Sequence, residues 1–278
     1  MESLKTVDYA AFDIILVDNG STDPSVELFQ KLYANDSGVE ILKNSVNLGF
    51  AEGNNVGIRR ALEKGSEYVL LLNNDTLVDK HILVHLVRTA LTDPKIALAG
   101  PKVYYQDDPQ RLYSSFDRVN LWFMSALPTT GGQVDQGQFD HVREVDNLAG
   151  CALLVSAEAI REVGLLDPDY FAYYEEVDWS LRIRKAGYKV VFVPHAIVYH
   201  KGGASLGRAE PSLIAYYKIR NLILFMRKHA HWGQWVTFLP TLFGIVLFRI
   251  GRAAIHRDFK TVNAILRGVC YHLPAAPV

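Results

Sequence analysis

The sequence predicts an α/β fold built on a mostly parallel, doubly wound sheet. Short apolar runs alternate with amphipathic segments, and the connections between them are short. Polar side chains directly follow several apolar runs, which is typical of the carboxyl ends of strands in such sheets, where ligands bind. With 278 residues, 49% of them hydrophobic, the chain is long enough for one large domain, or for one domain with an appendage.

The expected elements can be placed by apolar runs and capping residues. In chain order they are a strand at 12–17, a helix at 25–34, a strand at 39–43, a helix at 51–64, a strand at 67–72, a helix at 79–91 and a strand at 96–99. Pro24 begins the first helix after the cap Asp23, and Gly65 follows the end of the second. The pattern fades between 101 and 142, which is either a loop over a site or a surface excursion. Later elements are a strand within 145–155, a helix at 157–163, and strand-like runs at 190–193 and 197–199 around Pro194.

The strand at 67–72 ends in the polar residues Asn73, Asn74 and Asp75. A carboxylate at this edge of the sheet is placed to hold a hard cation, or a ligand that carries one. The alternative is an ordinary polar turn, with Asp79 capping the next helix.

A second group of acidic residues begins a predicted helix that Gly187 ends. Glu175, Glu176 and Asp178 lie in its first turn, where the helix dipole favours their ionised forms and their mutual repulsion raises at least one pKa. Such a carboxylate is suited to act as a general base. The alternative is a structural acidic turn with an ion pair between Asp178 and Arg182.

His200 ends a strand-like run and precedes a glycine-rich loop that begins after Lys201. It is a candidate to complete a metal site with Asp75 or to donate to a phosphate, and the alternative is a structural histidine. The sequence has no dinucleotide fingerprint, phosphate-loop lysine motif or nucleophile elbow. The pattern that remains favours a metal-bridged phosphate ligand next to a carboxylate base.

Charge and apolar patterning limit the partners. The formal net charge is −1, so no basic excess indicates nucleic acid, and two distant cysteines fit a reducing compartment. Residues 230–248 contain no Lys, Arg, Asp or Glu, and cationic residues flank both ends. This favours a helix lying on the cytoplasmic face of a membrane, with a spanning helix or a buried hairpin as alternatives.

Six ordered blocks carry a family resemblance. They are residues 17–23, 47–57, 72–76, 150–155, 173–182 and 198–203. Together they resemble the family 2 inverting glycosyltransferases with a GT-A fold, especially the rhamnosyltransferase-like branch. The resemblance implies a GT-A domain at 1–210, and the apolar, cation-flanked run predicts a helical, membrane-associated region at 211–278. It also implies that a strand preceding the one at 12–17 is missing, which would expose two strand edges and weaken nucleotide binding.

The resemblance also assigns roles to individual residues. Asp75 matches the last acid of the Asp-x-Asp motif and Asn73 replaces the first, so His200 gains weight as the second ligand of Mg²⁺ or Mn²⁺. Glu176 matches the catalytic base, and Glu175 or Asp178 is expected to share this role. The expected substrate-binding residues are Asp18 and Asn19 at the nucleotide base, and Asn47, Asn55 and Asn74 in the rest of the donor site.

The expected activity is transfer of a sugar, rhamnose by analogy, from a nucleoside-diphosphate-sugar to a hydroxyl of a glycan or lipid-linked acceptor in cell-envelope polysaccharide synthesis. One alternative is a catalytically impaired, membrane-associated nucleotide-binding or scaffold protein. The other is a nucleotide-sugar nucleotidyltransferase, which predicts a glycine-rich basic phosphate loop near the amino end, and the sequence has none there.

Overall fold

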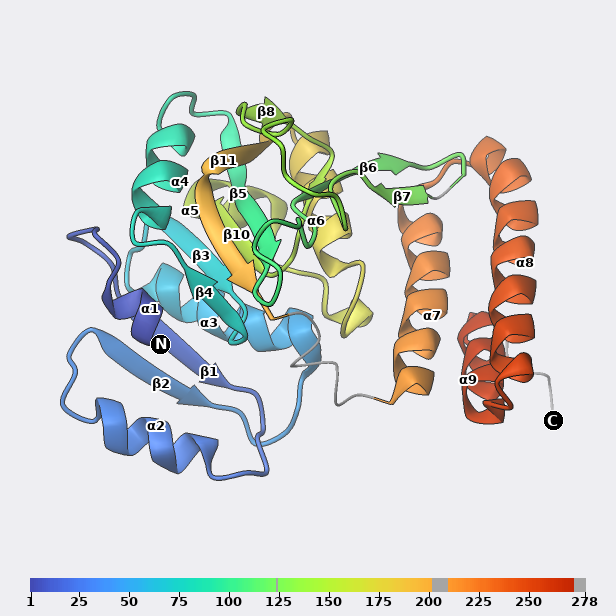
Figure 1. Ribbon diagram of the computed structural model, residues 1–278, viewed down its shortest axis with the longest axis horizontal. Helices are drawn as coiled ribbons and strands as arrows, with labels where there is room; N and C mark the ends of the chain where they lie inside the picture. The colour runs from blue at the N-terminus through green and yellow to red at the C-terminus, as the bar shows by residue number, and fades with distance from the viewer. Residues whose placement is uncertain (124, 202–209, 273–278) are drawn as a thin grey trace.

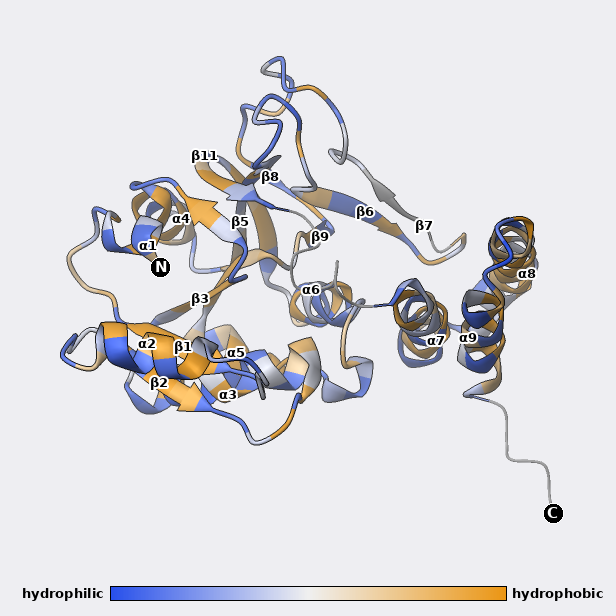
Figure 2. Ribbon diagram, turned by 60° about the horizontal axis from the view of Figure 1, so that its bottom comes forward, coloured by the Kyte–Doolittle hydropathy of each residue, from blue (hydrophilic) through white to orange (hydrophobic). Residues whose placement is uncertain are grey.

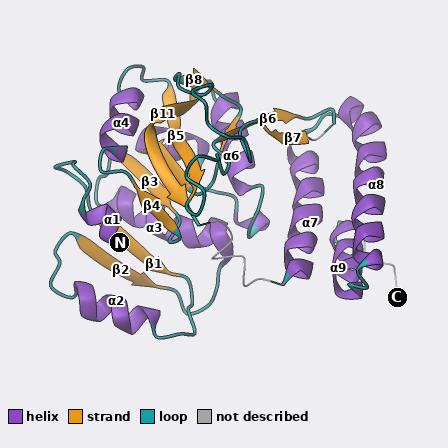
Figure 3. Cartoon of the chain, viewed as in Figure 1, coloured by secondary structure: helices purple, strands orange, loops and turns teal. Residues whose placement is uncertain are grey.

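A computed structural model of the protein describes residues 1–123, 125–201 and 210–272. Its centre is a six-stranded mixed sheet (Figures 1 and 3). Across the sheet lie β3 (Tyr68–Leu72), β10 (Ala152–Ser156), β5 (Ile96–Tyr105), β11 (Lys189–His200) and β4 (Thr76–Val78), and β8 (Arg143–Glu144) pairs with β11. Strands β3, β5 and β11 run in the same direction, whereas β10 and β4 run against their neighbours. The α/β sheet is confirmed, and the antiparallel β10 within it is an addition that the strand alternation did not predict.

Alternate side chains of the central strands enter two separate cores. On β10, Leu153 and Val155 lie in one core, and Ala152 and Leu154 lie in the other. The first core is covered by α3 (Gly49–Glu63), α5 (Ala157–Val163) and α6 (Glu175–Lys185), and the second by α4 (Ile82–Ala90). Helices therefore cover both faces of the sheet, which explains why its strands are continuous apolar runs.

The amino-terminal part forms a two-stranded sheet that is separate from the central sheet. Strands β1 (Ile14–Asp18) and β2 (Val39–Lys43) pair in parallel, and α1 (Glu2–Lys5) and α2 (Ser25–Tyr33) flank them. Among the strands that the structure describes, β1 pairs only with β2, and β3 pairs only with β10. One edge of each of these two strands therefore has no strand partner in this part of the chain.

The region at 101–142, which the sequence left open, is an ordered excursion. Within it, β6 (Phe116–Asn120) pairs with β7 (Ser125–Pro128) and with β9 (Asn147–Leu148). The excursion is anchored to β5 by the buried Lys102, whose Nζ lies 2.8 Å from Asp135 and 2.5 Å from Asp140. Tyr104 also donates a hydrogen bond to Asp135.

Three helices, α7 (Pro211–His229), α8 (Trp232–Ile255) and α9 (Phe259–Cys270), form the carboxyl-terminal part. In the views of Figures 1 and 2, α7 stands between α6 and α8. A third core joins these helices to α6 and to the short helix η1 (Pro168–Tyr170), through residues such as Tyr170, Val177 and Phe225. Helix α7 is thus part of the support of the region around residues 170–178.

The outer surface of α8 is apolar. Trp232, Val236, Leu239, Phe243 and Leu247 recur every three or four positions, and each is more than half exposed; we call these five residues the apolar stripe. Within the described residues, α8 is the one helix whose length and composition would allow it to cross a membrane, and little of it is buried.

The bounds of most elements agree with the sequence analysis, and two strands are longer than expected. β5 extends from Ile96 to Tyr105 rather than ending at residue 99. The two runs around Pro194 form the single strand β11, whose pairing with β5 is irregular between Val193 and Ile197. Proline lacks the N–H that a regular ladder needs, so the strand continues through a local break.

Candidate active site

Asp75 and His200 meet at one end of the central sheet. Asp75 directly precedes β4, His200 ends β11, and antiparallel pairing sets His200 opposite Thr76. The Nε2 atom of His200 lies 3.1 Å from Oδ1 of Asp75, and the two side chains are 5% and 6% exposed. The backbone N–H of Lys201 donates to the carbonyl of Asp75 at 3.0 Å. The two predicted metal ligands are therefore neighbours. The glycine-rich loop that begins after Lys201 lies outside the described residues.

Asp75 and His200 could supply two of the ligands that a divalent cation needs. A carboxylate oxygen and an imidazole nitrogen are both ligands for Mn²⁺. Burial lowers the pKa of His200, although Asp75 opposes this, so the neutral ring that a cation needs is favoured. In the described chain, Nδ1 of His200 is buried without a hydrogen-bond partner. Across the described ranges no three His, Cys, Asp or Glu side chains form a metal-binding group. The other ligands would then be substrate oxygens and water.

The segment at Gly150 and Cys151 links this pair to the acidic start of α6. The carbonyl of Cys151 accepts a hydrogen bond from the N–H of Asn73 at 2.9 Å, beside the strand end that carries Asp75. A Cβ added to Gly150 would lie 3.5 Å from Cβ of Glu176. Burial raises the pKa of the Cys151 thiol to about 12, and the charges of Asp75 and Glu176 add to this effect. Both carboxylates therefore border the same short segment.

Glu175 and Glu176 lie in a poorly solvated place. Glu175 is 5% exposed, and Oε2 of each glutamate is buried without a hydrogen-bond partner in the described chain. Burial raises the pKa of Glu176 to about 7, and the charge of Asp117 contributes in the same direction. Burial also raises the pKa of Glu175 well above its ordinary value, helped by repulsion from Glu176. The predicted upward shift is therefore present, and burial is a larger cause than the repulsion between carboxylates.

A strained turn positions the start of α6. Phe171, Tyr173 and Tyr174 have φ angles of 61°, 72° and 76°, a left-handed conformation that is costly for such bulky residues. The buried Asn221 of α7 holds this turn. Its Nδ2 donates to the carbonyls of Tyr170, Ala172 and Tyr173 at 2.7, 2.7 and 2.8 Å. Strain of this kind persists only where the surrounding structure enforces it.

Asp178 is engaged by partners within the protein, which favours a structural role over its expected share in catalysis. Its Oδ2 accepts from Nε of Arg182 at 2.7 Å, and its Oδ1 lies 2.6 Å from Nε2 of His229 and 3.2 Å from the Tyr170 hydroxyl. Although burial opposes it, His229 and Arg182 lower the pKa of Asp178. The alternative interpretation, an ion pair with Arg182, is the one the geometry supports.

The residues expected at the nucleotide lie at the ends of β1 and β2. Asp18 ends β1; its Oδ1 accepts from the N–H of Ser21, and its buried Oδ2 has no hydrogen-bond partner in the described chain. Asn19 is engaged within the protein, because it donates to Asn47 at 3.2 Å and accepts from the N–H of Leu48 at 3.1 Å. Asp18 is thus the better candidate for ligand contact, and Asn19 shapes the loop that carries Asn47.

The two other asparagines of the expected donor site differ in exposure. Asn55 is 1% exposed, donates to Glu52 and to the carbonyl of Leu166, and accepts from the N–H of Leu166. This placement argues against its expected role, because its amide joins α3 to the segment after α5 inside the protein. Asn74 is exposed beside Asp75 and stays a candidate.

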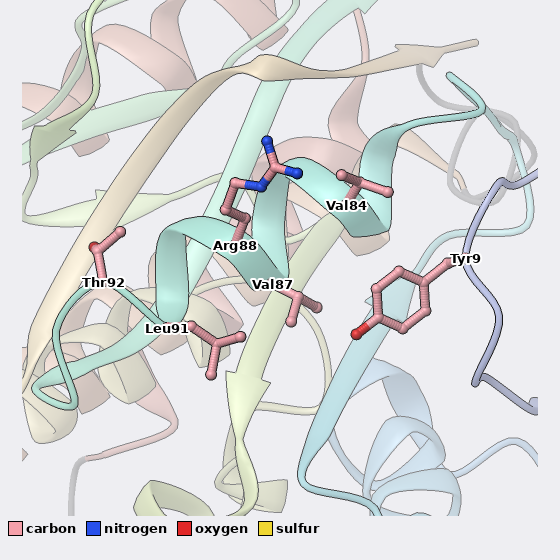
Figure 4. Close-up of a pocket in the computed structure, with 6 residues that line it drawn as sticks. All are labelled: Tyr9, Val84, Val87, Arg88, Leu91 and Thr92. Atoms are coloured by element: carbon pink, nitrogen blue, oxygen red, sulfur yellow. The ribbon is translucent and has the colours of Figure 1, made fainter.

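Two surface hollows lie away from these residues. One, of about 310 Å³, lies between Tyr9 and the outer side of α4, where Val87 and Arg88 contribute to its lining (Figure 4). The other, of about 620 Å³, is lined by residues that include Lys102 and His195. Neither is lined by Asp75, His200 or the glutamates, so these hollows are not the predicted site.

Three residues near the site were not found from the sequence. Tyr113 packs its ring against His200, with ring centres 4.4 Å apart. Asn221 holds the strained turn, and Lys218 places its ammonium group 4.9 Å from the centre of the Tyr173 ring. The one available signal was a polar pair, Lys218 and Asn221, beside the apolar residues of α7.

Solved structures with the same fold place the protein in a class. A mannosyltransferase from Pyrobaculum calidifontis in complex with GDP-Man and Mn²⁺ matches with a TM-score of 0.58 and 14% identity over 97% of this chain and 80% of that one. GalNAc-T7 with UDP, GalNAc and Mn²⁺ matches with a TM-score of 0.56 and 18% identity; 77% of this chain spans 42% of that protein. The fold is therefore that of the GT-A glycosyltransferases.

The family follows from the sequence comparisons. Residues 1–149 match the model of glycosyl transferase family 2, and the chain belongs to this family. An N-acetylglucosaminyl-diphospho-decaprenol L-rhamnosyltransferase of Mycobacterium tuberculosis is 27% identical over 84% of this chain and 81% of its own length. A dTDP-rhamnosyl transferase of Shigella flexneri is 25% identical over 78% of this chain and 71% of its own length. The expected family and its rhamnosyltransferase-like type are confirmed.

Proposed function

We propose that this glycosyltransferase moves a sugar from a nucleoside-diphosphate-sugar to an acceptor hydroxyl in one displacement, with inversion at the anomeric carbon. The observation that carries the proposal is the segment at Gly150 and Cys151, which borders Glu176 on one side and the strand end before Asp75 on the other. Groups suited to the diphosphate and a base suited to the acceptor therefore flank one short stretch of chain.

In this reaction Glu176 acts as the general base. Its Oε2 takes the proton of the acceptor hydroxyl while the acceptor oxygen forms its bond to the anomeric carbon. The bond from that carbon to the phosphate oxygen breaks on the opposite side, and its electron pair leaves with the nucleoside diphosphate. A pKa of about 7 suits this role near neutral pH, because the base is then half ionised and still binds a proton well.

The residues that would hold Mg²⁺ or Mn²⁺ are Asp75 and His200. When bound, the cation would supply positive charge that stabilises the leaving diphosphate. Asp18, with a buried Oδ2 that has no partner in the described chain, is proposed to contact the nucleoside, and the exposed Asn74 the diphosphate or sugar.

The names of the relatives support the choice of substrates. The relatives from Mycobacterium tuberculosis and Shigella flexneri are named as rhamnosyl transferases, and the former has a lipid-linked diphosphate sugar in its name. We therefore infer a rhamnosyl donor and a glycan or lipid-linked acceptor of the cell envelope. Family membership favours this reading over a nucleotidyltransferase.

A nucleotide-release assay tests the proposed function. Purified protein is given isotope-labelled dTDP-rhamnose, Mn²⁺ and an envelope lipid extract. Glu176→Gln and Asp75→Ala are each expected to lower turnover by about 100-fold or more, and Glu158→Gln, an exposed glutamate on α5, is the matched control. Wild-type turnover in both site variants would reject the assigned roles.

The apolar stripe supports a location on the cytoplasmic face of the membrane, with residues 211–278 as the membrane-associated region. Each large apolar side chain that moves from water into the membrane contributes about 1.5–3 kcal/mol to the free energy of membrane binding. The triple variant Val236→Ser, Phe243→Ser and Leu247→Ser is therefore expected to be released from lipid vesicles in co-sedimentation. Leu91→Ser, at an equally exposed apolar residue far from the stripe, is the control. Equal sedimentation of the triple variant and wild type would contradict the membrane assignment.

A further inference from the structure

Arg220 of α7 is a buried cation next to the residue that holds the strained turn. It is 8% exposed, and its Nε is buried without a hydrogen-bond partner among the described residues. Its Nη1 donates to Oδ1 of Asn221 at 3.0 Å, and its Nη2 donates to the hydroxyl of Tyr271 at 3.3 Å. A guanidinium that has left water is costly unless nearby groups compensate for the loss, so we expect these contacts to fix its position.

Aromatic rings support the same guanidinium. Its Cζ lies 4.4 Å from the centre of the Tyr271 ring and 5.8 Å from the centre of the Tyr217 ring, within the range of cation–π attraction. Tyr271 directly follows α9, which packs closely on α7, because a Cβ added to Gly268 would lie 2.9 Å from the carbonyl oxygen of Tyr216. The position of Arg220 therefore depends on the contact between α7 and α9, which lie side by side in Figure 2.

The hydrogen bond from Arg220 fixes which way the amide of Asn221 points. Nδ2 of Asn221 donates to three carbonyls of the turn at 170–173. The reverse orientation would set the amide NH₂ group against the guanidinium and the amide oxygen against carbonyl oxygens. Because a hydrogen bond from a charged donor is roughly twice as strong as a neutral one, Arg220 favours the orientation that holds the turn.

The turn leads directly into α6. Tyr174, with a φ of 76°, is the N-cap of α6, and Glu176 is the second residue of that helix. Oε2 of Glu176 is buried without a hydrogen-bond partner in the part of the chain that the structure describes. We therefore expect the direction of this carboxylate to follow from the backbone that carries it, and thus from the turn.

We propose that Arg220 is a positioning residue of the transfer reaction: it orients Asn221, which holds the turn that sets the carboxylate of Glu176 towards the acceptor. The inference rests on the proposed function, in which Glu176 is the base. Without the guanidinium the amide of Asn221 is free to rotate and the turn relaxes, because such strain persists only where the surrounding structure enforces it. A displacement of about 1 Å can lower the rate by about 10²-fold.

Steady-state kinetics with the labelled donor and the lipid extract test this role. Arg220→Met is expected to lower kcat by about tenfold or more and to change donor KM by less than about twofold. Arg220→Lys keeps a charged donor and is expected to retain more kcat than Arg220→Met; equal loss would overturn the role of the cation. Arg267→Gln, which removes a guanidinium 5.7 Å from the centre of the Tyr216 ring between the same two helices, is the matched control and is expected to leave kcat within about twofold.

A double-mutant cycle tests whether Arg220 acts through Asn221. In the Asn221→Ala background, Arg220→Met is expected to lower kcat by no more than about twofold, because the amide that it orients is already gone. A further loss of about tenfold in the double variant would overturn the proposal, since the two residues would then act independently.

The pH profile of kcat is a readout that a merely structural role would not move. Burial raises the pKa of Glu176 to about 7, and a relaxed turn admits water. The midpoint of the profile is therefore expected to move towards the ordinary value of 4.5 in Arg220→Met. The charged groups that act on Glu176, namely Asp117, Glu175 and Lys218, all remain in this variant. A lowered kcat with an unchanged midpoint would overturn the positioning role.

Failure of this inference and failure of the proposed function give different results. If the inference fails, Arg220→Met has wild-type kcat and a wild-type pH profile while Glu176→Gln is inactive. If the proposed function fails, Glu176→Gln itself has wild-type turnover.

Discussion

Replacement of Glu176 by glutamine is expected to change activity and stability in opposite directions. The amide has nearly the same shape but cannot take a proton, so transfer is expected to fall by about 10²–10⁴-fold, the usual contribution of a general base. Because burial raises the pKa of Glu176 to about 7, wild-type kcat is expected to rise with pH below 7 and to level off above it. At pH 6, about one tenth of the molecules carry an ionised Glu176.

The effect on stability has the opposite sign. A carboxyl group with a pKa of 4.5 in the unfolded chain and about 7 in the folded chain holds its proton more tightly when folded. Stability therefore falls as pH rises from 4.5 to 7, by at most about 3 kcal/mol from this one group. Glutamine removes this cost, and it also relieves the neighbouring Glu175 of repulsion.

Activity and urea unfolding are measured from pH 4 to 9 for wild type, Glu176→Gln and the surface control Glu158→Gln. The variant is expected to be inactive throughout, to match wild-type stability near pH 4 and to exceed it at pH 8. A variant that is inactive and less stable than wild type at pH 8 would refute the reasoning, since inactivity would then follow from damage to the fold.

Three further predictions concern the support of the site. Asn221→Ala is expected to lower kcat by about tenfold or more with little change in donor KM, and to shift the pH profile of kcat. The reason is that the strained turn before Glu176 loses its hydrogen bonds to Asn221. An unchanged pH profile would argue against a role of Asn221 in positioning Glu176. Lys102→Met is expected to destabilise the protein by about 3–5 kcal/mol in urea unfolding, because Asp135, whose side chain is 11% exposed, loses its buried cation, and adding Asp135→Asn should recover part of this; no loss would contradict the anchor. Asp178→Asn is expected to destabilise at pH 7, and the difference from wild type is expected to shrink in acid, because His229 and Arg182 lower the pKa of Asp178, so that its stabilisation is complete above the unfolded pKa of 3.8 and is lost as pH falls through the lower folded pKa; a difference that does not change as the pH is lowered through the acid range would exclude a charge effect.

Most of the fold could be predicted from the sequence, because the apolar runs of strands buried on both faces and the residues that begin and end helices are local signals. The run before Asp75 and the helix at 157–163 are examples, and the structure has both. The pairing of Asp75 with His200 could be proposed only from their positions after apolar runs. The three-residue strand β4, whose register sets them side by side, is too short to predict from pattern.

The rest of the site depended on contacts between distant parts of the chain. The resemblance identified residue types but not which way their side chains point. Asn55 was therefore expected at the donor, although it lies inside the protein. The sequence could not distinguish Asp178 from Glu175 and Glu176, because its partner His229 lies 51 positions later in the chain. Asn221 and Lys218 act on residues more than forty positions away, and no local pattern reports such contacts.

The most direct test of the account is the affinity for Mn²⁺ in the presence of nucleoside diphosphate, measured by electron paramagnetic resonance. Asp75→Asn and His200→Gln are each expected to weaken Mn²⁺ binding by about tenfold or more, whereas Glu176→Gln is expected to leave it unchanged. Wild-type Mn²⁺ affinity in both of the first two variants would contradict the assignment of the diphosphate end of the site, and with it the proposed reaction.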